Sequence, residues 1–165
     1  MIRMSKLTDY GIVLMTRLAE HSQAGENCSA RDLARETGLP LPVVSKILKL
    51  LSKNRLLKSQ RGANGGYSLA RSATDISVSE VIGAMEGPIA VTECMDTPGD
   101  CRQEPVCPVR HNWRKINNAI SSVLDAITVA DMLEPLPDSL VTLTGLEIPL
   151  DGSKLTGGSA SSLTA

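Results

Sequence analysis

The sequence predicts a mainly α protein with a small β-hairpin, in which a winged helix-turn-helix is followed by a long dimerisation helix. The first observation behind this fold class is a pair of amphipathic helices joined by a glycine-containing turn and followed by a glycine-rich hairpin, all within residues 1–75. The second is a narrow apolar seam that recurs every three or four residues along an otherwise polar segment after residue 111.

The composition of the chain restricts the classes of protein to which it can belong. The chain has 165 residues, of which 42% are hydrophobic and 21% are charged. These values are ordinary for a globular protein and exclude wholesale disorder or a collagen-like fibre. No apolar run approaches the roughly 18 residues that a membrane-spanning helix needs. The first residues also lack the apolar core of a signal peptide, so we expect a cytoplasmic protein.

Charge is divided unevenly along the chain, although the formal net charge is only −1. Residues 1–75 hold 12 Lys and Arg against 6 Asp and Glu, whereas the remainder hold 5 against 12. The first part is therefore a candidate for a surface that binds a polyanion. Two solvated faces of opposite sign would give the same totals.

Three helices are expected in the first part. Residues 7–21 are apolar on most of a helical circumference, which indicates a buried helix with Thr8 as its cap. A second helix begins after Ser29 and ends at Gly38. The third helix, residues 41–54, is amphipathic. Its predicted buried stripe consists of Val43, Val44, Ile47, Leu48, Leu50 and Leu51.

The third helix and the hairpin supply the side chains expected to contact double-stranded DNA. In a winged helix the third helix enters the major groove and the hairpin, or wing, lies near the minor groove or the backbone. Basic and hydroxyl side chains on the polar side of this helix can reach bases and phosphates. The candidates are Ser45, Lys46, Lys49 and Lys53 on the helix, with Lys58 and Arg61 on the wing.

The rest of the chain is expected to form three further parts after the winged helix-turn-helix of residues 1–75. These are a short helix and a cysteine-rich loop (76–111), a dimerisation helix (112–133) and a disordered tail (134–165). The seam of the dimerisation helix consists of Trp113, Ile116, Ile120, Val123 and Ile127. Because the stripe is narrow and the helix long, we favour a homodimer over a helix packed on its own domain. A dimer would bind a pseudo-palindromic operator.

Three of the four cysteines lie close together, at Cys94, Cys101 and Cys107. No CxxC pair of the kind typical of zinc sites is present, whereas well-separated thiolates on one loop can hold an iron–sulfur cluster. His111 and Asp9 are the candidates for a fourth ligand. Free thiols, a zinc site of unusual composition and a disulfide switch remain alternatives. Cys28 stands alone and is interpreted as structural.

These features together resemble the winged-helix iron–sulfur regulators of bacteria, the IscR and NsrR type. The matching segments are LTDYG at 7–11, KN at 53–54, RGANGGY at 61–67 and the three-cysteine loop. The resemblance covers about residues 4–132, and the loop and the segment 128–132 look most like the subgroup that regulates the SUF iron–sulfur assembly operon. It implies a homodimeric repressor that carries a [2Fe-2S] or [4Fe-4S] cluster and senses cluster supply.

The sequence departs from this family's pattern in three respects. The first cysteine gap has six residues rather than five, and His111 lies one residue further from the last cysteine than the ligand histidine of the IscR type. Asp9 matches the ligand aspartate of the NsrR type. Pro40 and Pro42 stand where the IscR type has polar base-reading residues, so the DNA site is not assumed to be the same. A nitric-oxide or redox response, or a zinc or metal-free regulator, are the alternatives.

An enzyme is not expected. The sequence contains no phosphate loop, dinucleotide fingerprint or Ser/His/Asp set, and it has only two histidines.

Overall fold

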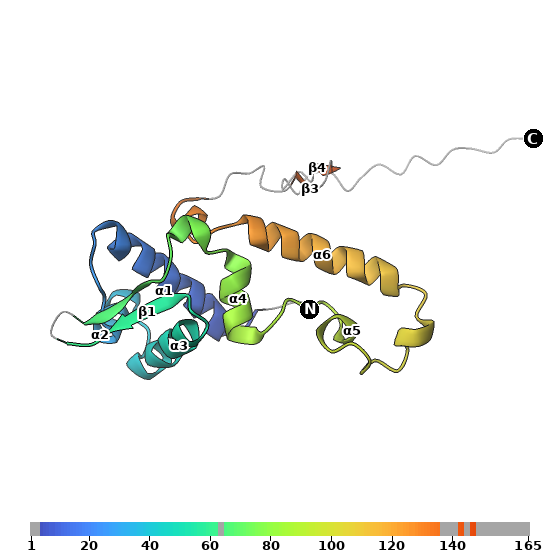
Figure 1. Ribbon diagram of the computed structural model, residues 1–165, viewed down its shortest axis with the longest axis horizontal. Helices are drawn as coiled ribbons and strands as arrows, with labels where there is room; N and C mark the ends of the chain where they lie inside the picture. The colour runs from blue at the N-terminus through green and yellow to red at the C-terminus, as the bar shows by residue number, and fades with distance from the viewer. Residues whose placement is uncertain (1–3, 63–64, 136–141, 144–145, 148–165) are drawn as a thin grey trace, which may run out of the picture. The chain divides into compact units, whose positions relative to one another are not determined.

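The computed structural model describes residues 4–62, 65–135, 142–143 and 146–147, and the chain divides into one unit of residues 1–135 and a second of residues 136–165. Figure 1 shows the elements in order. The helices are α1 (Lys6–Gln23), α2 (Ala30–Thr37), α3 (Leu41–Lys53), α4 (Val78–Glu86), α5 (Glu93–Asp96) and α6 (Arg110–Ala126), and the wing strands are β1 (Leu57–Gln60) and β2 (Gly66–Leu69). Short 3-10 turns occupy η1 (Ala73–Asp75), η2 (Glu104–Val106) and η3 (Asp131–Leu133). The predicted fold class, mainly α with one β-hairpin in a winged helix, is confirmed.

The cap of α1 is Ser5, so the prediction of Thr8 was wrong. The Ser5 side chain accepts a hydrogen bond from the Thr8 backbone N–H, which satisfies one of the free donors in the first turn. Thr8 itself is fully buried, and its hydroxyl donates to the Glu86 carboxylate at the end of α4. The Ser5 N–H donates to the same carboxylate, at 2.8 Å. Glu86 thus ties the end of α4 to the beginning of α1.

The helix-turn-helix forms as the sequence predicts. The Ser29 hydroxyl accepts from the Asp32 N–H at 3.2 Å and caps α2. Gly38 ends α2 in the left-handed conformation, with φ of 68°, where a side chain would be strained. Pro42 lies in the first turn of α3, where no backbone donor is lost.

The core lies between α1, α2, α3 and α4, and the partly buried rings of Tyr10 and Tyr67 pack against it. Its fully buried side chains include Leu14, Met15, Leu18, Leu33, Val44, Ile47, Leu48, Leu51, Ile76 and Val81. The buried stripe of α3 is narrower than predicted, because Leu50 is only half-buried and faces outward among lysines. The helix therefore presents an outer face with one apolar side chain in it.

The wing is a two-stranded antiparallel hairpin whose register runs from Leu57 opposite Leu69 to Gln60 opposite Gly66. Near the tip, β2 pairs with the chain before α2, because the Cys28 N–H donates to the Tyr67 carbonyl and the Tyr67 N–H donates to the Cys28 carbonyl. A Cβ on Gly66 would lie 2.7 Å from the Cys28 carbonyl oxygen, so only glycine permits this approach.

Helix α6 ends seven residues earlier than the predicted boundary at 133, and the placement of Ile127 in a helical seam was wrong. Ile127 is extended, and its carbonyl accepts from the Val78 N–H at 2.8 Å. The Asp131 carboxylate accepts from both the N–H and the hydroxyl of Thr128 and stabilises a separate turn. These contacts join residues 127–129 to the beginning of α4 and replace the next helical turn.

The second unit contains two short strands, β3 (Thr142–Leu143) and β4 (Leu146–Glu147), which pair antiparallel. These strands lie within the segment 134–165 that was predicted as a disordered tail, of which residues 134–135 belong to the first unit. Most of the rest of that tail lies outside the described residues. Among the helices that are described, none is both long and apolar enough to cross a bilayer.

Candidate DNA interface and cysteine loop

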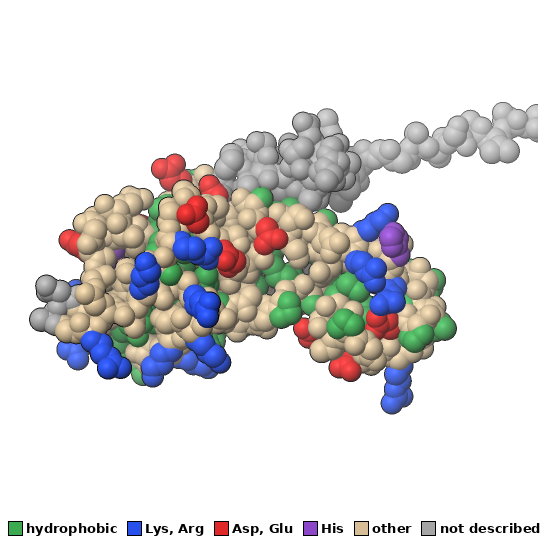
Figure 2. Space-filling view, in the orientation of Figure 1, with side chains coloured by type: hydrophobic (Ala, Val, Ile, Leu, Met, Phe, Trp, Pro, Cys, Tyr) green, Lys and Arg blue, Asp and Glu red, His purple; other side chains and the backbone are tan. Residues whose placement is uncertain are grey.

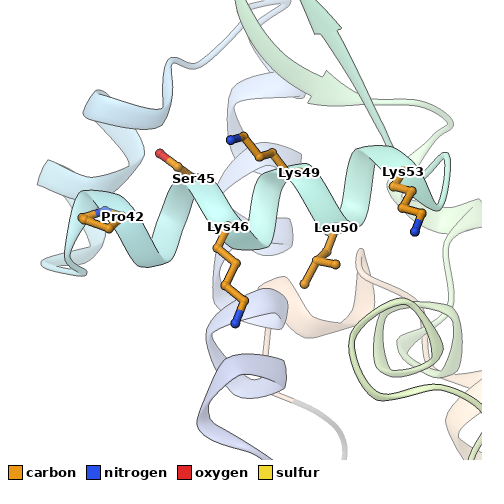
Figure 3. Close-up of a pocket in the computed structure, with 6 residues that line it drawn as sticks. All are labelled: Pro42, Ser45, Lys46, Lys49, Leu50 and Lys53. Atoms are coloured by element: carbon orange, nitrogen blue, oxygen red, sulfur yellow. The ribbon is translucent and has the colours of Figure 1, made fainter.

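Four predicted DNA contacts share one face of α3, which we call the recognition face: Ser45, Lys46, Lys49 and Lys53. With Pro42 and Leu50 they line a shallow hollow. Figure 3 shows Ser45 and Lys49 pointing to one side of the helix and Lys46 and Leu50 to the other. Positions three and four apart lie on one side of a helix, so this spacing places all four polar groups on its outer surface.

In the part of the chain that the structure describes, the basic side chains of this surface form no ion pairs with Asp or Glu. Within the described residues, the ion pairs formed by Lys and Arg join Arg17–Glu20, Arg35–Asp32, Arg71–Glu80 and Arg110–Glu104. Lys46, Lys49, Lys53, Lys58 and Arg61 are in none of them and are all exposed. Figure 2 shows Lys and Arg gathered along the edge that α3 and the wing form. Such an unpaired basic surface suits the phosphate backbone of DNA.

Arg61 lies at the tip of the wing, directly after β1. Gly62 has φ of 114°, a conformation that favours glycine. A Cβ on Gly65 would lie 2.5 Å from the Gln60 carbonyl oxygen, so the turn also requires glycine there. These glycines make the tip thin enough to approach a groove. Residues 63–64 lie outside the described part of the tip.

The cysteine loop, residues 88–109, contains the other predicted site. Cys94 lies in α5 and is buried, and it shares a hydrogen bond with the Thr92 hydroxyl at 3.3 Å. Cys101 and Cys107 are half-buried on either side of η2. In the described chain these three sulfurs do not lie within 4.8 Å of one another, the spacing at which side chains could share a single ion.

The two candidates for a fourth ligand are both exposed. His111 lies in the first turn of α6, and Asp9 lies in the first turn of α1. Neither belongs to a group of ligand atoms within 4.8 Å in the described residues. The structure therefore does not choose between them.

Sequence reasoning missed the residue that organises the loop, Glu104. It is only 8% exposed. One carboxylate oxygen accepts from the Gly99 N–H at 2.7 Å and the other pairs with Arg110 at 2.5 Å. The Arg110 Nε is buried without a hydrogen-bond partner among the described residues. Glu104 lies midway between two cysteines, a position that could have identified it as a candidate.

The loop is attached to α6 by a second polar contact. The Asn117 side chain accepts from the Val91 N–H at 3.0 Å and donates to the Ile89 carbonyl at 3.1 Å. Both backbone groups would otherwise lack a partner, since this stretch has no regular structure. The amide therefore fixes the first part of the loop against the middle of α6.

The apolar seam of α6 is divided between two surroundings. Trp113 and Ile116 are 37% and 45% exposed, which is unusual for such large apolar side chains. Ile120 lines a hollow of about 740 Å³ between α6, α4 and the cysteine loop. Val123 is half-buried. The C-terminal half of α6 thus packs on its own domain, and the N-terminal half presents an unpartnered apolar face.

A second group that the sequence spacing did not reveal consists of His21, Cys28 and Glu36. One ligand atom from each lies within 4.8 Å of the others. The His21 Nε2 is 3.0 Å from the Glu36 carboxylate, and its Nδ1 is 3.6 Å from Glu26. Hydrogen bonding to Glu36 raises the pKa of His21, whereas burial, reinforced by the negative charge of Glu36, raises the pKa of the Cys28 thiol to about 11.

The fold and the unpaired basic face define a winged-helix protein of the DNA-binding, transcription-regulating class. The chain belongs to the Rrf2 family, described as iron-dependent transcriptional regulators, whose model matches residues 4–135. This membership confirms the predicted family and places the chain among regulators rather than enzymes.

Individual relatives agree with this assignment. The transcriptional regulator IscR of Serratia proteamaculans is 32% identical over 132 residues, which are 80% of this chain and 79% of the relative. The solved structure of T. potens IscR superposes with a TM-score of 0.60 and 34% identity, covering 80% of this chain and 86% of that one. CymR of B. subtilis, a global cysteine regulator, superposes with a TM-score of 0.65 and 28% identity, covering 81% and 97%.

Proposed function

We propose that this regulator is a homodimeric repressor that senses iron–sulfur cluster supply and controls the genes of the SUF assembly system in the cytoplasm. The observation that carries the proposal is three cysteines on one loop that follows α4 in the chain and is hydrogen-bonded to α6. A cluster held there would affect the positions of the DNA-binding unit and of α6, and these two elements determine DNA binding.

The recognition face and the wing would bind the operator. Ser45 and Lys46 lie near the beginning of α3, where side chains of a recognition helix reach base edges. Lys49, Lys53 and Lys58 would contact phosphates, and Arg61 a minor groove. A symmetric dimer would present two such surfaces to a pseudo-palindromic site.

The residues of the cysteine loop fit an iron–sulfur cluster better than a single ion. Several thiolates on one loop are the usual ligands of an iron–sulfur cluster, and the three sulfurs do not all lie within the 4.8 Å at which they could share a single ion. The buried Arg110 Nε is an N–H donor of the kind that hydrogen-bonds cluster sulfurs. Cys94, Cys101 and Cys107 would hold the cluster, with His111 or Asp9 as fourth ligand.

The loop's own contacts would transmit the state of the site. When bound, a cluster supplies a redox-sensitive group that is gained or lost with iron and sulfide. Glu104 holds Gly99 and Arg110 in place, and Asn117 holds residues 89–91 against α6. Ordering the loop would therefore restrict α6 and the angle between the two DNA-binding units, whereas loosening it would impair binding to matched half-sites.

Anaerobic reconstitution with iron and sulfide tests the proposal. We expect a coloured protein with stoichiometric iron and acid-labile sulfide, and tighter binding to its operator than the apo form shows. Cys101→Ala should lose both properties. A colourless, iron-free protein would favour a zinc or metal-free regulator, and release from DNA by nitric oxide but not by cluster loss would favour the nitric-oxide alternative.

The dimer is tested separately at the exposed end of α6. Ile116→Glu places a charge in the proposed seam and should convert the dimer to a monomer in sedimentation experiments. Val106→Glu is the matched control, because Val106 is 75% exposed and lies off the seam. Equal masses for the wild type and Ile116→Glu would contradict the seam.

A further inference from the structure

We propose that His21, Cys28 and Glu36 form a binding site for a zinc-type divalent ion, which strengthens the attachment of the wing. The site lies where the end of α1, the chain before α2 and the end of α2 meet. It is separate from the cysteine loop and from the recognition face, and it shares no residue with either.

The geometry needs little adjustment to accept an ion. Bond lengths of about 2.0–2.3 Å place the ligands of a tetrahedral zinc about 3.3–3.8 Å apart. The three donor atoms already lie within 4.8 Å of one another, and the His21 Nε2 and the Glu36 carboxylate are 3.0 Å apart. Rotation of partly exposed side chains can close the remaining gap. Water would occupy the fourth position.

The donor set matches the chemistry of zinc. Thiolate, imidazole and carboxylate are its usual ligands, whereas calcium and magnesium prefer oxygen alone. Glu26 lies 3.6 Å from the Nδ1 of His21, the nitrogen not directed at Glu36. A carboxylate on the outer nitrogen orients a ligand histidine and increases its basicity. The buried Cys28 thiol is protonated at neutral pH, so binding would release its proton to solvent.

An ion at Cys28 would act on the wing through backbone pairing. Cys28 and Tyr67 exchange two hydrogen bonds, of 3.0 and 2.8 Å. The Asn27 side chain adds a third by donating to the Gln60 side chain at 3.0 Å. Because Gly66 lies against the Cys28 backbone, displacement of Cys28 must displace β2. Fixing Cys28 to α1 and α2 would therefore fix β2 at the end nearest the tip of the wing.

Cobalt(II) titration of the full chain tests the site. In a variant with Cys94, Cys101 and Cys107 replaced by serine, Cys28 is the only thiol left. We expect one equivalent of cobalt, with the sulfur-to-cobalt charge-transfer and visible bands of tetrahedral coordination, displaced by zinc. His21→Gln and Glu36→Gln in this background should weaken binding by more than tenfold, and Glu26→Gln by about tenfold or more.

The matched control is Glu20→Gln. It removes a carboxylate of α1 that lies outside the site and pairs with Arg17. It should bind cobalt like the parent. A parent without the charge-transfer band, or equal affinities in the parent, His21→Gln and Glu36→Gln, would overturn the site.

Amide exchange tests the effect on the wing in the same protein. Saturating zinc should slow exchange of the Cys28 and Tyr67 amides severalfold. The Ala70 amide, which donates to Leu56 at the other end of the hairpin, should change little. Zinc binding that leaves the Cys28 and Tyr67 amides unchanged would overturn the coupling to the wing.

Discussion

The winged helix-turn-helix and the cysteine loop are stabilised by different interactions. The first encloses side chains such as Leu14, Ile47 and Leu48, which are completely buried. The second buries one cysteine and one carboxylate, and it depends on hydrogen bonds from Glu104 and Asn117. A core built from dispersion and hydrophobic contact forms without a ligand. A loop held by a few polar groups can change its order when one contact is gained or lost.

This difference suits a sensor. On the proposed function, a bound group would order a loop held by few contacts while the DNA-binding unit keeps its shape. The hydrogen bond to Asn117 holds the cysteine loop against α6 next to Ile116, one of the exposed apolar residues of the seam.

The largest expected effect is loss of core packing in the DNA-binding unit. Leu48→Ala removes a fully buried side chain and should lower the free energy of unfolding by about 2–5 kcal/mol. Val106→Ala, in the cysteine loop, should lower it by less than about 0.5 kcal/mol because that side chain is 75% exposed. Chemical denaturation measures both. Equal losses would show that the loop belongs to the same cooperative core.

DNA binding should depend on unpaired cations rather than on basic residues in general. Lys46→Ala and Arg61→Ala should each weaken binding by about 1–3 kcal/mol, as is typical of groove contacts. Arg17→Ala should have little effect, since Arg17 pairs with Glu20 on α1. Titrations against the protein's own promoter at several salt concentrations test this. Unchanged affinity in both groove variants would refute the recognition face.

Some features of the structure could be predicted from the sequence and others could not, because they depend on different kinds of contact. The cap Ser29, the stop at Gly38 and the hairpin were predictable, because each depends on neighbouring residues alone. The Ser5 cap and the end of α6 before Ile127 were not. Both depend on contacts with α4, remote in sequence, through Glu86 and Val78. Glu104 and the His21 group were missed for the same reason, since their partners are set by tertiary structure.

A smaller and local effect is expected from Glu104→Gln. The amide keeps the size of the side chain but leaves the half-buried Arg110 without its counter-charge. In the apo protein, proteolytic cleavage near Gly99 should accelerate severalfold, as expected for an opening made easier by about 1 kcal/mol. The unfolding midpoint of the core should barely change. Glu93→Gln, which changes an exposed carboxylate of α5, is the matched control, and equal cleavage rates in the two variants would refute the role of Glu104.

The smallest effect concerns pH and the join between α4 and α1. Hydrogen bonds from Thr8 and Ser5 lower the pKa of Glu86 below its usual value of 4.5. A carboxyl whose pKa is lower in the folded state stabilises the fold above the unfolded value, and this contribution is lost as pH falls through the folded value. The wild type should therefore lose stability below about pH 4.5. Glu86→Gln should be less stable at neutral pH and should lose less on acidification, whereas an unchanged acid slope in thermal unfolding would show that Glu86 does not secure α4 to α1.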